Sequence, residues 1–215
     1  MGFQILSSLI LLPLVGALFI LFVKSDISNN YQSSKYVALF TSFVNFLISV
    51  YLWYLFDNSI SEFQFIEDKQ WIKGFVNYKV GIDGISILFI VLTTLITPVS
   101  IISVNNSVSF RLKEFLIAIL VMESLMIGVF CSLDLIIFYL FFEGGLIPMF
   151  LIIGIWGGER KIYASFKFFL YTLLGSVLML LAVIFIYQIT GTMNIEEIQS
   201  YSISKKVQYI LWLAF

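Results

Sequence analysis

Phe138-Tyr139-Leu140-Phe141-Phe142-Glu143-Gly144-Gly145-Leu146-Ile147-Pro148-Met149-Phe150 is an apolar stretch with a single acid at its centre. It lies inside a longer apolar run, residues 134–156, and a membrane-spanning helix needs about 20 such residues. A charged side chain in the middle of such a helix costs about 2.5 to 3.5 kcal/mol on insertion scales. The stretch therefore predicts a spanning helix whose glutamate has a function.

Apolar runs of similar length recur along the chain. They cover residues 3–23, 36–56, 84–104, 113–132 and 163–190, and a shorter run covers 207–215. The predicted fold is an all-α polytopic transmembrane helical bundle, a single domain over residues 1–215, with six complete helices and a truncated seventh. Residues 57–83 are expected to form an extramembrane loop. The first run has no basic residue before it, so we expect a retained helix and not a signal peptide.

The composition excludes several classes of protein. Hydrophobic residues make up 60% of the chain and charged residues 12%, against about 25% charged residues in a soluble domain. The formal net charge of -1 gives no basic surface for nucleic acid. Because the chain has no His and a single Cys, Cys131, we expect no metal site and no redox cofactor in this chain.

The polar stretch after the second run gives mixed signals. Trp71, Phe75 and Tyr78 have helical spacing, whereas Phe63 and Phe65 alternate as in a strand. Periodicity leaves helix and strand open here. In either case we expect these aromatic residues at the membrane interface or against a partner. Asp83 and Asp134 are expected to cap the helices that follow them.

Basic residues indicate the orientation of the chain. The loops after the first, third and fifth runs carry basic residues with few acids, namely Lys24, Lys35, Arg111, Lys113, Arg160, Lys161 and Lys167. The opposite loops contain more acidic than basic residues. By the positive-inside rule the first set faces the cytoplasm or matrix, so the N-terminus is expected to face outward.

Glu123 is a second acid inside an apolar run. Glu123 and Glu143 each lie about ten residues, or about 15 Å, from the turn at Leu133, near the middle of a core of about 30 Å. Burial disfavours the charged form of a carboxyl group and a nearby cation favours it, which is what a proton relay requires. The alternative is a protonated glutamate that only hydrogen-bonds to a neighbouring helix.

Two further features accompany Glu143. Pro148 lacks an N–H group and Gly144 and Gly145 lack side-chain bulk, so we expect a local helix break near the acid. Lys167 lies near the start of the sixth run. It either extends toward the interface or acts as a cation that modulates the charge of Glu143 or Glu123.

The central stretch, together with other motifs, resembles the antiporter-like proton-pumping subunits of respiratory complex I (NADH:ubiquinone oxidoreductase), in particular the N-terminal part of the subunit M or chain 4 type. The other motifs are Ile155-Trp156-Gly157-Gly158, Lys167-Phe168-Phe169-Leu170-Tyr171-Thr172-Leu173-Leu174-Gly175-Ser176, Gly81-Ile82-Asp83-Gly84-Ile85-Ser86 and Met122-Glu123-Ser124. The resemblance is specific between residues 81 and 180, and the first eighty residues match only in hydropathy and spacing.

The resemblance implies a fold of about fourteen helices with inverted repeats, in which the fifth-helix glutamate, here Glu143, pairs with a lysine on the seventh helix. No lysine stands between Val207 and Phe215. It also implies that NADH, FMN, iron–sulfur clusters and quinone are bound by partner subunits, and that this chain contacts other complex I membrane subunits and the lipid bilayer. The expected location is a bacterial inner membrane or the mitochondrial inner membrane.

Three functions remain open at this stage. The first is a proton-translocating subunit of complex I, with Glu143 and Glu123 as relay residues. The second is a subunit of a multi-component sodium/proton antiporter or a membrane-bound hydrogenase. The third is a membrane scaffold in which both acids are structural.

Overall fold

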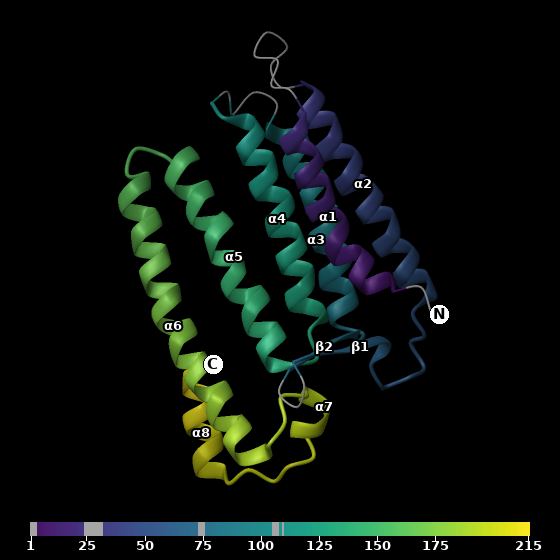
Figure 1. Cartoon of the computed structure of the whole chain (residues 1–215), viewed down its shortest axis with the longest axis vertical. Helices are drawn as coiled ribbons and strands as arrows, with labels where there is room; N and C mark the ends of the chain where they lie inside the picture. Colours follow the sequence, from purple (N-terminus) through teal and green to yellow (C-terminus); the bar gives the residue numbers. More distant parts are fainter. Residues whose placement is uncertain (1–3, 24–31, 73–75, 105–107, 109) are drawn as a thin grey trace.

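The computed structural model describes residues 4–23, 32–72, 76–104, 108 and 110–215. Long helices dominate it (Figure 1) and are α1 Ile5–Phe22, α2 Gln32–Leu55, α3 Ser86–Ser103, α4 Leu112–Cys131, α5 Leu135–Trp156 and α6 Lys161–Thr190. These six are long and apolar enough to cross a membrane. The chain is a polytopic helical membrane protein.

The six helices form a four-helix group with a two-helix extension. Helices α1 to α4 pack against one another, α5 packs on α4, and α6 packs on α5 (Figure 1). A further helix, α8 Lys205–Ala214, lies against α6. Large apolar side chains remain exposed along α1, α2, α3, α5 and α6, and α4 exposes Met126. In a membrane protein such faces contact lipid or other subunits, because lipid tails are as apolar as the side chains.

Two features of the helices differ from those expected, the start of α2 and the continuity of α5. Helix α2 begins at Gln32, before the apolar run, so the polar residues ahead of that run are also helical. Helix α5 continues as one helix through Gly144, Gly145 and Pro148, which corrects the expected break. A proline inside a spanning helix removes one backbone hydrogen bond, and the bonds on either side keep the helix continuous.

The stretch that periodicity left open forms an antiparallel β-hairpin. Strand β1 covers Gln64–Ile72 and pairs with β2 Val76–Ile82. Trp71 and Tyr78 therefore lie on strands, and Phe75 lies outside the described residues. The hairpin sits at one end of the bundle beside the short helix α7 Ile195–Ile198 (Figure 1).

The hairpin caps the start of α1. The carboxyl group of Glu67 on β1 accepts hydrogen bonds from the backbone N–H of Leu6 at 2.9 Å and of Ser7 at 3.2 Å, and from the Ser7 hydroxyl. Gln4, which directly precedes the helix, makes no side-chain capping bond. A carboxylate satisfies the free N–H groups of a helix N-terminus and interacts favourably with the helix dipole. Glu67 thus anchors α1 to the hairpin.

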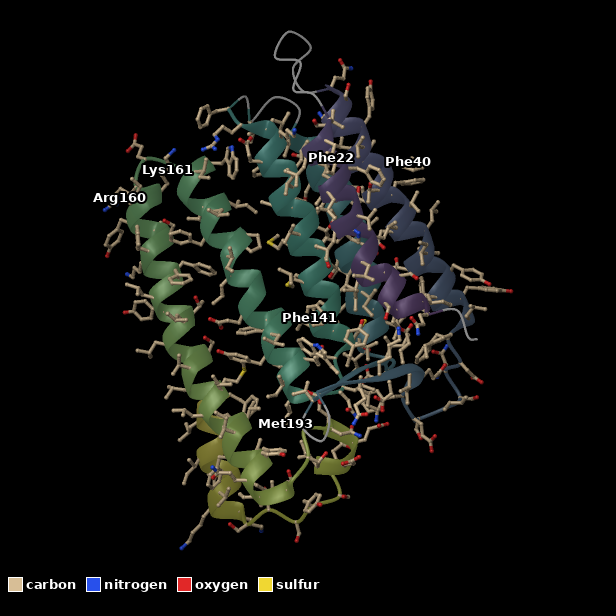
Figure 2. The ribbon with its side chains drawn as sticks, viewed as in Figure 1. Phe22, Phe40, Phe141, Arg160, Lys161 and Met193 are labelled. Carbon is tan, nitrogen blue, oxygen red and sulfur yellow. The ribbon has the colours of Figure 1, made fainter. Side chains whose placement is uncertain are left out.

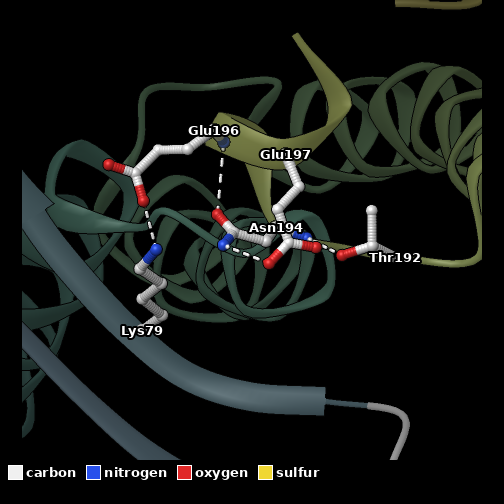
Figure 3. Close-up of polar contacts among 5 residues, drawn as sticks. All are labelled: Lys79, Thr192, Asn194, Glu196 and Glu197. Atoms are coloured by element: carbon white, nitrogen blue, oxygen red, sulfur yellow. Dashed lines mark hydrogen bonds and ion pairs between the residues drawn. The ribbon is translucent and has the colours of Figure 1, made fainter. Parts of the chain in front are cut away.

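The other strand is linked to the start of α5 and to α7. The Leu133 N–H donates to the Lys79 carbonyl at 3.0 Å, and the Lys79 ammonium group forms an ion pair with Glu196 of α7 (Figure 3). Asn194 caps α7 by accepting from the Glu196 N–H at 3.2 Å, and its amide nitrogen donates to Glu197 (Figure 3). The hairpin therefore connects segments that lie far apart in the sequence.

The expected cap at Asp134 is confirmed, whereas the N-cap position of α3 is Ile85 and Asp83 bonds to this helix from two residues before that position. The Asp83 carboxyl group accepts from the backbone N–H of Ser86 at 2.7 Å at the start of α3. The Asp134 carboxyl group accepts from the N–H of Ile136 at 2.9 Å and of Ile137 at 3.2 Å at the start of α5. The two bonds to Asp134 are the side-chain bonds of an N-cap.

Several basic residues gather at the end of the bundle opposite the hairpin. Arg160 and Lys161 lie at this end, near the level of Phe22, whereas Met193 lies at the other end (Figure 2). The Trp156 indole N–H donates to the Phe110 carbonyl at 2.7 Å, which joins the end of α5 to the α3–α4 connection. Lys24 lies outside the described residues. Which end faces the cytoplasm or matrix stays a prediction.

Candidate functional site

A layer of polar side chains crosses the interior of the four-helix group. Two apolar clusters fill the rest of that interior. On α4 the cluster nearer the hairpin includes Ile127 and Cys131, and the other includes Leu116 and Leu120. Between the clusters lie buried polar residues from three helices, namely Asn45, Ser49, Thr94, Glu123 and Ser124. A buried polar layer at this position needs internal hydrogen bonds, because lipid offers none.

Glu123 lies in this layer and is bonded to α2. Its side chain is 2% exposed, and its Oε1 accepts a hydrogen bond of 2.8 Å from Nδ2 of the fully buried Asn45. The second carboxyl oxygen, Oε2, and the amide oxygen of Asn45, Oδ1, are also buried. Neither atom has a hydrogen-bond partner among the described residues. The contact thus uses half of the hydrogen-bonding atoms of the pair.

Other members of the layer bond to neighbouring helices. The hydroxyl groups of Ser49 on α2 and Thr94 on α3 are 2.6 Å apart. The Ser124 hydroxyl donates to the Ile10 carbonyl of α1 at 2.5 Å. Together with the Asn45–Glu123 bond, these contacts join all four helices at one level.

Glu143 lies on a different helix face, toward α6. It is half-buried, and its Oε2 is buried with no hydrogen-bond partner among the described residues. Its spacing from Phe150 and Gly154 places the three on one face of α5. That face meets α6, because a Cβ atom on Gly154 would lie 3.2 Å from the Ser165 hydroxyl. The antiparallel register then sets Glu143 level with the buried Ser176.

The two acids lie at similar depth. A Cβ atom on Gly144 would lie 3.2 Å from the Leu125 side chain, which fixes the register of α5 against α4. Glu143 is therefore level with Met126, and Met126 is one helical turn from Glu123. At 1.5 Å per residue this separation is about 4.5 Å along the helix axis. The two carboxyl groups thus belong to adjacent antiparallel helices at nearly one level.

A groove of about 370 Å³ leads to Glu123 from the surface shared by α3, α4 and α5. Most of its lining is apolar, and three hydroxyl-bearing residues of α3, Thr93, Thr97 and Ser100, also line it. The Thr97 hydroxyl donates to the Thr93 carbonyl at 3.0 Å, and its oxygen can still accept a hydrogen bond. Glu123 therefore contacts both the closed interior, through Asn45, and an open groove.

Lys167 lies away from both acids in this structure. It is exposed on α6, and its Nζ lies 5.9 Å from the ring centre of Tyr163 and 6.0 Å from that of Tyr171. The α5–α6 register sets it about nine residues, or about 13 Å, from the level of Glu143. Its role as a charge modulator stays a prediction.

The glycines beside Glu143 differ in their surroundings. Gly144 faces Leu125, whereas nothing lies within 4 Å of a Cβ atom built on Gly145. A much closer contact occurs at Gly128, where a Cβ atom would lie 2.5 Å from the Phe141 ring. Gly128 thus sets the close approach of α4 to α5.

Asn45 was not among the site residues predicted from the sequence. An uncharged amide inside an apolar run, Phe43-Val44-Asn45-Phe46-Leu47, is a signal of the same kind as a buried acid, because both need a partner within the bundle. No group of three or more His, Cys, Asp or Glu side chains among the described residues could hold a metal ion.

These features define a class of protein, a polytopic membrane protein with carboxyl groups inside its helical bundle. Comparisons with known proteins narrow the class. Residues 132–215 match the profile of the family described as NADH:quinone oxidoreductase/Mrp antiporter, transmembrane. The chain is 46% identical over 212 residues to NADH-ubiquinone oxidoreductase chain 4 of Marchantia polymorpha, and 51% identical over 197 residues to NADH-quinone oxidoreductase subunit M of Rhodobacter capsulatus.

The chain belongs to this family, and the relatives it matches are chain 4 and subunit M proteins. These alignments cover 98% and 86% of the chain but 42% and 38% of the two relatives, so the chain spans less than half of their length. The fold is also similar to a chain of respiratory complex I from Thermus thermophilus. The TM-score is 0.83 and the identity 27%, over 97% of this chain and 42% of that one.

Proposed function

We propose that this chain serves in a proton-translocating membrane subunit of NADH:quinone oxidoreductase, and that Glu143 and Glu123 are its proton-relay residues. One observation carries the proposal. Two carboxyl groups lie at nearly one depth on adjacent helices of a membrane bundle that is 46% identical to a chain 4 protein. Intramembrane acids are rare and usually mark ion or proton paths.

The surroundings of the two acids fit proton exchange. An ionised carboxyl group inside a bundle needs a cation or several donors, and each acid has an oxygen atom without a partner among the described residues. A cation that approaches would favour loss of the proton, and its departure would favour return of the proton. The groove, which Thr93, Thr97 and Ser100 line on one side, gives Glu123 a path out of the interior.

The partners and cofactors follow from the same proposal. NADH oxidation and quinone reduction take place on partner subunits, and this chain contacts the other membrane subunits through its exposed apolar faces. The N-terminus faces outward, and the end that carries Arg160 and Lys161 faces the cytoplasm or matrix.

The decisive experiment replaces Glu143 in the assembled complex. Glu143→Gln keeps shape and hydrogen bonding but removes the exchangeable proton, so NADH-driven proton transport into membrane vesicles should fail while assembly survives. Glu143→Asp should retain part of the transport. Glu159→Gln, an exposed acid in the α5–α6 connection, is the matched control and should transport normally.

Unchanged proton transport by assembled Glu143→Gln complexes would reject the proposal and favour the scaffold function. The family description also names Mrp antiporters, so transport should be measured with and without sodium ions. Transport that stops when sodium is removed would favour the antiporter function.

A further inference from the structure

The hydrogen bonds between Asn45 and Glu123 are incomplete if Glu123 is ionised. Asn45 Nδ2 donates to Glu123 Oε1, but Asn45 Oδ1 and Glu123 Oε2 are buried without a partner among the described residues. Both of these atoms are acceptors when the carboxyl group is ionised. Two neighbouring side chains would then each bury an acceptor with no donor, which is a costly arrangement.

A single proton on Glu123 gives both of these oxygen atoms a hydrogen-bond partner. A protonated carboxyl group carries one O–H donor, and an amide oxygen is a good acceptor for it. The amide of Asn45 and the carboxyl group of Glu123 are both planar, and each ends in two polar atoms. The two groups already share one hydrogen bond of 2.8 Å. When the planes of the two groups align, the bond between Nδ2 and Oε1 brings Glu123 Oε2 and Asn45 Oδ1 together.

We propose that Asn45 holds Glu123 in its protonated form as a closed acid–amide pair. Glu123 Oε2–H donates to Asn45 Oδ1, while Asn45 Nδ2–H donates to Glu123 Oε1. Asn45 is thus a positioning residue that sets how readily Glu123 releases its proton. This role deepens the proposed function, on which its meaning for transport rests.

Among the described residues, no positively charged side chain is bonded to Glu123. The elements packed against α4 are α1, α2, α3, α5 and β2, and α1 and α3 contain no acidic or basic residue. The titratable residues on α2, α4, α5 and β2 are Lys35, Tyr36, Tyr51, Tyr54, Lys113, Glu114, Cys131, Tyr139, Glu143, Tyr78 and Lys79. The ion pairs among the described residues, Lys79–Glu196 and Arg111–Glu114, do not involve Glu123.

The pair connects α2 to α4 through both hydrogen bonds only while the proton stays on Glu123. Loss of the proton removes the O–H donor and sets a carboxylate oxygen against the Asn45 amide oxygen, so one bond is lost and a repulsion replaces it. Because the other side of Glu123 lines the groove, the released proton has an exit that does not pass Asn45.

Infrared difference spectroscopy on the assembled complex tests the pair directly. A protonated carboxyl group gives a carbonyl stretching band, which Glu123→Gln should abolish and thereby assign. In Asn45→Leu the band should shift to higher frequency, because the carboxyl group loses its hydrogen bonds to the amide. Ser49→Ala is the matched control, because Ser49 lies one turn along α2 and bonds to Thr94. It should leave the band in place.

Thermal disassembly of the complex gives a second measurement. Glu123→Gln can form both bonds as an amide–amide pair, so its midpoint should match that of the natural protein. Glu123→Leu should lower the midpoint, since it leaves Asn45 buried without a partner. Adding Asn45→Leu to Glu123→Leu should restore much of the loss, because both polar groups are then gone.

Two spectroscopic results would overturn the proposed acid–amide pair. One is that no carbonyl band depends on Glu123, and the other is that Asn45→Leu leaves the band at the same frequency. A midpoint for Glu123→Gln as low as for Glu123→Leu would also overturn the pair. Proton transport in the same vesicles separates the two proposals. Normal transport by Glu123→Gln would reject a relay role for Glu123, yet the acid band and its shift in Asn45→Leu would still establish the pair.

Discussion

Asn45 and Glu123 lie 78 residues apart in the sequence, and their side chains meet in the interior with a nitrogen–oxygen distance of 2.8 Å. This bond joins α2 to α4 between the two apolar clusters of the four-helix group. Glu143, by contrast, makes no side-chain hydrogen bond among the described residues. The two acids at similar depth thus differ, because Glu123 is bonded to an amide and the buried Oε2 of Glu143 has no partner among the described residues.

The contact between α4 and α5 at Gly128 should be intolerant of larger residues. In Gly128→Ala the new Cβ atom would lie 2.5 Å from the Phe141 ring, so the helices must shift or the ring must move. Overpacking of this kind costs about 1 to 3 kcal/mol. We expect a lower midpoint of thermal disassembly and weaker proton transport, because this contact also sets the relative positions of the two acids.

Gly145→Ala is the matched control for this prediction. Nothing lies within 4 Å of a Cβ atom at Gly145, so the same chemical change should leave both stability and transport intact. Equal losses in the two variants would show that glycine flexibility matters and not the close contact at Gly128.

Removal of the carboxyl group of Glu67 should loosen the start of α1. Glu67→Ala leaves the N–H groups of Leu6 and Ser7 without their acceptor, and the loss of a helix cap costs about 0.5 to 2 kcal/mol. Hydrogen exchange measured by mass spectrometry should become faster over residues 5–8. The exposed Glu62 offers a control, since Glu62→Ala should leave this exchange unchanged.

The cap at Asp134 should make stability depend on pH. Burial raises the pKa of Asp134 above its ordinary value of 3.8, and this effect exceeds that of its backbone hydrogen bonds from Ile137, Ile136 and Asn77, which lower the pKa. The folded state therefore binds the proton more tightly than the unfolded state, so the stability contribution of Asp134 falls as the pH rises past 3.8.

Asp134→Asn keeps an N-cap but does not titrate. The midpoint of the natural protein should therefore fall relative to that of Asp134→Asn as the pH is raised from acid to neutral. Asp134→Ala should be less stable at every pH, by about 0.5 to 2 kcal/mol, because it loses the cap. A constant difference between the natural protein and Asp134→Asn would mean that the pKa of Asp134 is not raised.

The proposed orientation is testable by cysteine labelling. Ser59 lies near the hairpin and Gly158 lies in the α5–α6 connection, and both are exposed. A cysteine introduced at Gly158 should react with an impermeant reagent only from the cytoplasmic or matrix side, and one at Ser59 only from the opposite side. The native Cys131 is buried and should contribute little background. The reverse pattern would show that the N-terminus faces inward.

Local patterns in the sequence predict the parts of this fold that depend on local chemistry. Six apolar runs correspond to six helices that can span a membrane, since each run must bury its own backbone polar groups within one segment. Asp134 could be assigned as a cap because an N-cap lies next to the helix that it caps.

The rest depends on contacts between distant segments. The Glu67 cap of α1 comes from a residue 61 positions away from Leu6, and Asn45 meets Glu123 across 78 positions. The hairpin could not be told from a helix because its aromatic residues fit both periods. The strand pairing and its bonds to α5 and α7 decide in favour of the hairpin.

The cap of α1 by Glu67 also has a consequence for how the chain is made. Helix α1 is synthesised before the hairpin, and the carboxyl group that satisfies the start of this helix follows about sixty residues later. Until the hairpin has folded against α1, the first turn of this helix lacks its acceptor and can fray. The start of α1 is therefore fixed only after α2 and the hairpin have been made.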